Sequence, residues 1–140
     1  MTSKTIEATE VEQLAKGLVQ VLETYEGIDE VFAANAFLDI NVPTWRFQLE
    51  SPTAFIAWLQ EYCPGGYRIS ARPPLATASG FVLEVEGEYA DHHGSELFFR
   101  NLYVCGVQNA RVSEMSFWCT GDWDAETRDH HKAEVQLLRP

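Results

Sequence analysis

Residues 81–120 read FVLEVEGEYADHHGSELFFRNLYVCGVQNARVSEMSFWCT and carry the clearest structural pattern in the chain. Three strand-like runs follow one another through short turns, at 81–90, 96–107 and 111–120. In the first run apolar side chains alternate with acids: Phe81, Leu83, Val85 and Tyr89 against Glu84, Glu86 and Glu88. A period of two is typical of a strand with one buried and one solvated face. The stretch therefore predicts an antiparallel meander.

Opposite charges suggest how the first two strands pair. A hairpin at Asp91–Ser95 places Glu86 opposite Arg100 on the outer face, and such cross-strand pairs favour one register. That register also predicts the facing pairs Glu88–Phe98 outside and Leu83–Tyr103 and Val85–Asn101 inside.

The residues before this meander predict three helices and a strand. Leu14, Leu18, Leu22 and Tyr25 form the apolar stripe of an amphipathic helix over residues 6–26. Asp29 can cap a short second helix that runs to about Asn35, and alternation in NVPTWRFQLE predicts a strand after Pro43. Ser51 and Pro52 are typical of the start of a third helix. Residues 67–79 form a strand-like run interrupted by Pro73 and Pro74, which predicts an edge strand or a bend.

The segment after the meander predicts a short closing helix. Asp124 can cap the helix AETRDHHKAE, and Trp123 can pack against the sheet as a hydrophobic staple. For Asp122 two readings stay open, a structural residue of the turn or a base that reaches inward at the mouth of the sheet. The 140 residues predict one domain, with 135–140 as a tail.

Composition excludes several classes of partner. The chain has 21 acidic and 10 basic residues and a formal net charge of −11, so it lacks the basic stripe that nucleic acids or anionic membranes attract. No apolar run approaches the roughly 20 residues of a membrane span. The chain has an odd number of cysteines at wide spacing, which indicates free thiols: Cys63, Cys105 and Cys119. We therefore expect a cytoplasmic protein.

The order of the expected elements is helix, helix, strand, helix and then four strands. With the segments GIDEVFAANAFLDINVPTWRF and NARVSEMSFWCTGDWD, this order resembles the nuclear-transport-factor-2-like superfamily, which includes SnoaL-like polyketide cyclases and ketosteroid isomerase. The resemblance implies an α+β, cystatin-like fold: a cone-shaped, curved antiparallel sheet covered by three N-terminal helices, with a short C-terminal helix. It also implies a pocket between sheet and helices.

The inner face of the predicted cone supplies the candidate substrate-binding residues. Packing of a solid core competes with this role for most of them, because they are apolar. They are Trp45, Phe47, Trp58, Tyr62, Phe99, Met115, Phe117 and Cys119.

Four polar residues are the catalytic candidates. Asn101 and Tyr103 face inward in the predicted register, and a buried amide or phenol needs hydrogen-bond partners that a substrate could supply. Asp39, which the sequence places at the end of the second helix region, and Asp122 are the candidate acids or bases. A carboxylate in an apolar cone would have a raised pKa and could transfer protons near neutral pH.

Several better-known chemistries do not match. Ketosteroid isomerase needs a tyrosine and two aspartates, and near the corresponding places this chain has Gly17 or Leu18, Thr44 or Trp45, and Asn101 or Tyr103. Limonene epoxide hydrolase, another member of the superfamily, uses an aspartate–arginine–aspartate relay, but Arg100 points outward in the predicted register. The adjacent histidines His92–His93 and His130–His131 lack metal-ligand spacing. We therefore expect no metal and no cofactor.

Two functions remain as hypotheses. The first is a cyclase, isomerase or dehydratase that acts by acid–base chemistry on a hydrophobic, polyketide-like small molecule in secondary metabolism. The second is a non-catalytic module that binds a small molecule or dimerises. An apolar outer-face patch favours a homodimer, and its expected members are Phe98, Leu102, Val104, Val112 and Trp118.

Overall fold

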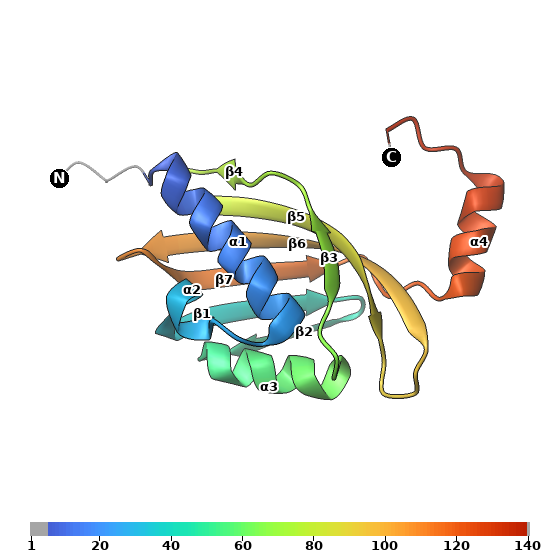
Figure 1. Cartoon of the computed structure of the whole chain (residues 1–140), viewed down its shortest axis with the longest axis horizontal. Coiled ribbons are helices and arrows are strands. Elements are labelled where there is room, and N and C mark those ends of the chain that lie inside the picture. Colours follow the sequence, from blue (N-terminus) through green and yellow to red (C-terminus); the bar gives the residue numbers. More distant parts are fainter. Residues whose placement is uncertain (1–5, 140) are drawn as a thin grey trace.

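A curved seven-stranded sheet forms the body of the protein, and three N-terminal helices cover one of its faces (Figure 1). The computed structural model describes residues 6–139. The helices are α1 (Ala8–Thr24), α2 (Ile28–Val31), α3 (Pro52–Tyr62) and α4 (Ala125–Glu134). The strands are β1 (Phe32–Val42), β2 (Trp45–Leu49), β3 (Arg68–Ala71), β4 (Leu75–Ala76), β5 (Gly80–Ala90), β6 (Glu96–Gln108) and β7 (Arg111–Cys119).

The sheet order is β2-β1-β7-β6-β5-β3, with β4 paired to β5. The predicted register between β5 and β6 is confirmed: Glu86 faces Arg100, and Leu83 faces Tyr103. The expectation of a wholly antiparallel sheet was wrong in one place, because β1 pairs with β7 in parallel. The α+β fold class itself is confirmed.

The second predicted helix was wrong in its cap, which is Gly27 and not Asp29, and wrong beyond its first turn. It ends at Val31, and the chain continues as β1, which carries Ala36, Leu38 and Ile40 into the core at every second position. Asp39 therefore lies in the middle of a strand and not at a helix end. The alanines and asparagine of FAANA have weak strand preference, but pairing with β7 overrides that local preference.

Local signals at the other helix starts are confirmed. The Ser51 side chain accepts a hydrogen bond from the Ala54 amide at 3.2 Å, with Pro52 at the first helical position. Asp124 caps α4 by accepting from the Thr127 amide at 2.8 Å. Residues 67–79 form β3 at the sheet edge and the short β4, with Pro73 and Pro74 between them.

The core lies between α1, α3 and the concave face of the sheet. Leu18, Leu22, Phe55 and Leu59 from the helices meet inward side chains of β1, β5, β6 and β7. Gly66 begins the return from α3 to the sheet, and the next residue, Tyr67, donates its amide to the Leu22 carbonyl at 3.0 Å. This contact attaches the end of α1 to the strand at the sheet edge.

A bulge near the start of β7 changes one face assignment. Gly106 pairs with Glu114, but the next residue, Val107, pairs with Val112, so Ser113 is the extra residue. Val112 is fully buried as a result. The predicted outer patch therefore loses Val112.

Helix α4 stands apart from the other helices, at the far end of the sheet (Figure 1). It has no buried residue. Trp123 fixes its start, because the backbones of Trp123 and Phe98 exchange two hydrogen bonds of 2.8 Å. The predicted packing of Trp123 on the sheet is confirmed, since its ring lies 6.1 Å from that of Phe98.

Candidate functional site

Asp122 meets two tyrosines where β7 leads into α4. Its Oδ2 atom accepts hydrogen bonds from the Tyr89 hydroxyl at 2.9 Å and from the Tyr62 hydroxyl. Tyr62 is the last residue of α3, and Tyr89 lies near the end of β5. We call Tyr62, Tyr89 and Asp122 the mouth cluster. The Asp122 carboxylate thus points to two phenols, while its side chain stays exposed.

The mouth cluster joins a surface carboxylate to buried donors. Tyr89 is buried, Tyr62 is half-buried and Asp122 is exposed. Burial raises the pKa of both phenols well above the usual value, and the Asp122 carboxylate raises it further. Both phenols therefore stay protonated at neutral pH and donate to Asp122.

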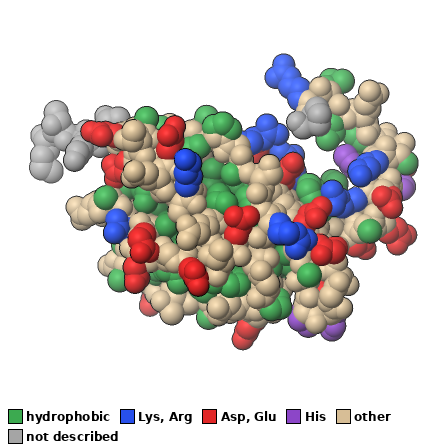
Figure 2. Space-filling view, viewed as in Figure 1, with side chains coloured by type: hydrophobic (Ala, Val, Ile, Leu, Met, Phe, Trp, Pro, Cys, Tyr) green, Lys and Arg blue, Asp and Glu red, His purple; other side chains and the backbone are tan. Residues whose placement is uncertain are grey.

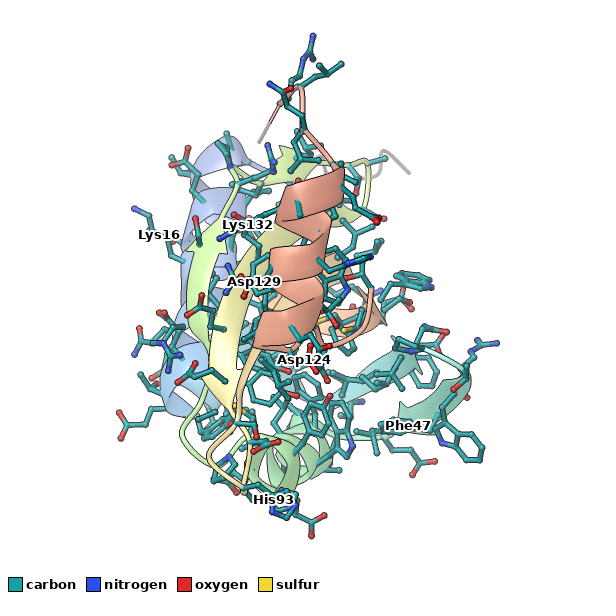
Figure 3. The ribbon with its side chains drawn as sticks, turned by 90° about the vertical axis from the view of Figure 1, so that its right-hand side faces the viewer. Lys16, Phe47, His93, Asp124, Asp129 and Lys132 are labelled. Atoms are coloured by element: carbon teal, nitrogen blue, oxygen red, sulfur yellow. The ribbon has the colours of Figure 1, made fainter. Side chains whose placement is uncertain are left out.

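An aromatic wall continues from the mouth cluster along α3. The rings of Trp58 and Tyr62 stack 5.5 Å apart at 11°, and Phe47 of β2 meets Trp58 edge-on at 5.1 Å. Three of the predicted substrate-binding residues thus lie in one row. Figure 3 shows Phe47 on β2, to one side of α4 and its starting residue Asp124.

Asn101 and Tyr103, which we call the inner pair, lie deeper on β6. The Asn101 side-chain amide donates to the Tyr103 hydroxyl at 3.1 Å, and Asn101 is only 3% exposed. Its Oδ1 atom has no hydrogen-bond partner among the described residues. Burial raises the pKa of Tyr103, so its phenol stays protonated. A buried amide oxygen without a donor is costly unless water or a ligand supplies one.

Cys119 lies between the two groups. It faces Asn101 in the pairing of β6 with β7, and its sulfur accepts from the amide of Gly121, the residue before Asp122, at 3.3 Å. Burial raises the pKa of its thiol to about 11. The thiol is therefore protonated at neutral pH and does not serve as a nucleophile.

The other predicted wall residues lie in the packed core. Phe99, Met115 and Phe117 are buried, and Phe117 stacks on Tyr103 at 5.2 Å. Trp45 departs from the prediction, because its side chain is 70% exposed on β2 at the sheet edge. Alternation put Trp45 on the same face as Phe47, but α3 covers only the part of β2 nearer Phe47 and Leu49.

Asp39 lies apart from the mouth cluster and belongs to an ion pair. It accepts two hydrogen bonds from Arg46 across the β1–β2 hairpin, at 2.8 and 2.9 Å. Its inward neighbours Leu38 and Ile40 are fully buried, so Asp39 points to the opposite face of the sheet. The Arg46 hydrogen bonds hold its pKa below the usual value. We leave Asp39 out of the candidate site.

Replacing Asp39 by asparagine should lower stability in a pH-dependent way. The folded-state pKa of Asp39 is depressed, so its stabilisation is present above the unfolded pKa of roughly 4 and is lost as the pH falls through the folded value. Urea unfolding of the wild type and Asp39→Asn should give a small difference at pH 7 that disappears near pH 2. A difference that persists at pH 2 would contradict this origin.

Tyr89 is the functional candidate that sequence reasoning missed. In the sequence it is only the last apolar position of the alternating run 81–90. A signal was present, because a buried tyrosine hydroxyl needs a partner, and that partner is Asp122. The sequence alone does not show that β5 and the turn after β7 meet.

A cavity of about 490 Å³ is lined by residues outside the mouth cluster and the inner pair. It is formed by one side of α1, by Ala71–Pro74 and by Leu83. Leu83 faces Tyr103 in the sheet, so the cavity adjoins the inner pair across one strand pairing. The volume is within the range of small-molecule pockets. Among the described residues, no three His, Cys, Asp or Glu side chains converge as metal ligands.

Comparison with known proteins supports the fold. No family model and no curated protein matches the sequence. Solved structures do match, among them an NTF2-like protein from Anabaena variabilis ATCC 29413, with 15% identity, a TM-score of 0.63 and coverage of 86% of this chain and 97% of that one. The chain thus has the fold of the nuclear-transport-factor-2-like superfamily.

Other neighbours carry names of different activities. An LEH-like epoxide hydrolase from M. tuberculosis has 11% identity and a TM-score of 0.62, with 79% of this chain and 83% of that one covered. A protein provisionally assigned as a SnoaL-like polyketide cyclase, from Jannaschia sp. CCS1, has 14% identity and a TM-score of 0.59, covering 79% and 88%. The fold therefore accommodates cyclases, isomerases and hydrolases. None of the helices in residues 6–139 is long and apolar enough to cross a membrane.

Proposed function

We propose that the protein is a cofactor-independent enzyme that moves protons on a hydrophobic small molecule, as a cyclase, isomerase or dehydratase does. The mouth cluster is the observation that supports this proposal. It combines an accepting carboxylate with two protonated phenols, which are the groups that proton transfer next to a carbonyl requires. The aromatic wall of Phe47, Trp58 and Tyr62 would contact the apolar body of the substrate.

In this mechanism Asp122 is the base. Both tyrosines donate to Oδ2, and no described residue donates to Oδ1. Oδ1 would take a proton from carbon, and one phenol of the cluster would turn its single O–H from Asp122 to the enolate oxygen that forms. If Asp122 returns the proton to another carbon, the result is isomerisation. If it gives the proton to a leaving hydroxide, water departs and the result is dehydration. If the enolate carbon attacks a second carbonyl of the same molecule, the result is cyclisation. Asn101 Oδ1 would accept from a substrate hydroxyl.

A generic proton-abstraction probe tests Asp122 without knowledge of the substrate. Nitrobenzisoxazole loses one carbon-bound proton to a base, its N–O bond breaks, and a coloured phenolate forms. We expect the wild type to accelerate this reaction and Asp122→Asn to lower the rate by roughly 10²-fold, the usual contribution of a positioned base. The measurement is initial rate against pH.

Asp124→Asn is the matched control. Asp124 lies two residues away and caps α4, and asparagine caps a helix as well as aspartate. Its rate should equal that of the wild type. Equal rates for Asp122→Asn and wild type would refute Asp122 as the base.

An alternative is a non-catalytic module that dimerises through the outer face of the sheet. Leu102, Val104 and Trp118 are 37%, 38% and 45% exposed, and Leu102 pairs directly with Trp118. We call these three residues the outer patch. Phe98, a predicted member of this patch, contacts Trp123 and the Arg128 guanidinium instead and is only partly exposed. A homodimer through the outer patch is compatible with either function.

A further inference from the structure

A cleft of about 260 Å³ separates α4 and the residues after it from the outer face of β5 and β6. Five of the ten lysines and arginines of the chain line it, although the chain carries a net charge of −11. They are Arg72, Arg100, Arg128, Lys132 and Arg139. Figure 2 shows Lys and Arg side chains gathered towards the α4 end of the molecule, whereas acidic side chains are spread over the visible face.

The positive charge of this cleft is only partly balanced. Glu86 is the one acid that lines it. Just outside, Glu84 pairs with Arg72 and Arg100, and Glu88 pairs with Arg128 at 2.8 Å. These salt bridges engage three of the five bases, which leaves an excess of two bases without a salt-bridge partner among the described residues.

The excess is carried by two specific side chains. Among the described residues, neither Lys132 nor Arg139 forms a salt bridge. Lys132 lies one helical turn after Arg128, so both project from the same side of α4. Figure 3 shows Lys132 on the side of α4 towards β3 and β5. Lys132 and Arg139 thus line one cleft without a salt-bridge partner among residues 6–139.

The cleft also has an apolar floor. Phe98 and Trp123 line it with their rings 6.1 Å apart, and Leu137 closes one end. The Arg128 guanidinium lies 4.4 Å above the Phe98 ring. An inorganic ion would use only the cations, whereas a ligand with a small ring would use this floor as well.

We propose that the cleft binds a small organic anion, a carboxylate or phosphate ester with an apolar or aromatic group. Its charged end would be held by Lys132 and Arg139 with Arg72 or Arg100, and its apolar part would pack on Phe98 and Trp123. Arginine forks and an ammonium group are the donors that such oxyanions need. This site stands independently of the proposed proton transfer at Asp122.

The frame of the cleft does not depend on the two unpaired cations. Helix α4 is attached by the backbone hydrogen bonds between Phe98 and Trp123 and by the Arg128–Glu88 pair. Replacing Lys132 and Arg139 leaves all of these contacts in place. The double variant Lys132→Ala/Arg139→Ala should therefore keep the native fold.

Titration followed by ¹⁵N–¹H NMR tests the site with defined probes: phenyl phosphate, benzoate, inorganic phosphate and neutral phenol. Phenyl phosphate or benzoate should shift the Trp123 indole resonance and bind more tightly than inorganic phosphate or phenol. The double variant should weaken that binding at least tenfold, since it removes two charged hydrogen-bond donors. The stronger of the two aryl anions identifies the acid group.

Lys16→Ala is the control, because Lys16 is a base on α1 that does not line this cleft. It should bind the probes as the wild type does. The proposal is overturned if no aryl anion binds at millimolar concentration, or if both variants weaken binding equally. Equal binding of inorganic phosphate and the aryl anions would overturn the role of the Phe98–Trp123 floor.

Discussion

Replacing Gly66 by alanine should lower the free energy of unfolding by about 3 kcal/mol or more. Gly66 has a φ of +78°, a conformation that costs other residues roughly 1–2 kcal/mol. An added Cβ would also lie 2.2 Å from the carbonyl oxygen of Glu23 in α1. Relief of that clash must move α1 away from β3 and break the Tyr67–Leu22 hydrogen bond.

Gly94→Ala isolates the conformational part of this effect. Gly94 has a similar φ of +82° in the β5–β6 turn, but a Cβ there meets nothing within 4 Å. Gly94→Ala should lower the free energy of unfolding by only about 1 kcal/mol. Urea unfolding of both variants at one protein concentration gives the comparison. Equal losses would show that the close approach of Gly66 to α1 has no energetic consequence.

Replacing Trp118 by glutamate should abolish the proposed homodimer. Trp118 lies near the end of β7 and is paired with Leu102, so an interface through the outer patch would bury it. A glutamate there would leave an unpaired charge in an apolar contact, and the dimer dissociation constant should rise at least a hundredfold. Sedimentation velocity over a dilution series measures that constant.

Trp45→Glu is the matched control for this experiment. It makes the same substitution at a tryptophan that is 70% exposed on β2, outside the outer patch. The control should dimerise as the wild type does. An unchanged dissociation constant in Trp118→Glu rules the outer patch out as the interface, and a monomeric wild type rules out the dimer.

Much of the fold could be predicted because its signals are local. The register of β5 and β6 follows from the glutamates at alternate positions of 81–90 and from Arg100. The helix starts follow from Ser51 and Asp124, whose side chains accept hydrogen bonds from nearby backbone amides. Strand β1 could not be predicted in this way. Its residues are stabilised as a strand by β7, a partner far along the chain.

The candidate site was predictable only in its components. Asp122 and Tyr62 could each be singled out, but their contact depends on how α3 and the turn after β7 pack. The same holds for the cleft at α4, where Arg72, Arg100 and Lys132 come from three separate segments. Periodicity indicates which face a side chain occupies, and tertiary packing decides what it touches.

The parallel pairing of β1 with β7 has a consequence for how the protein is made. Leu38 pairs with Met115, and Ile40 pairs with Phe117, so the first long strand acquires its neighbour only after most of the chain has been synthesised. On the ribosome, the β1–β2 hairpin would present an open edge throughout elongation. Pairing that forms so late slows folding and leaves the backbone N–H and C=O groups of the β1 edge unpaired for longer. Nascent chains halted before residue 111 should therefore be prone to aggregation.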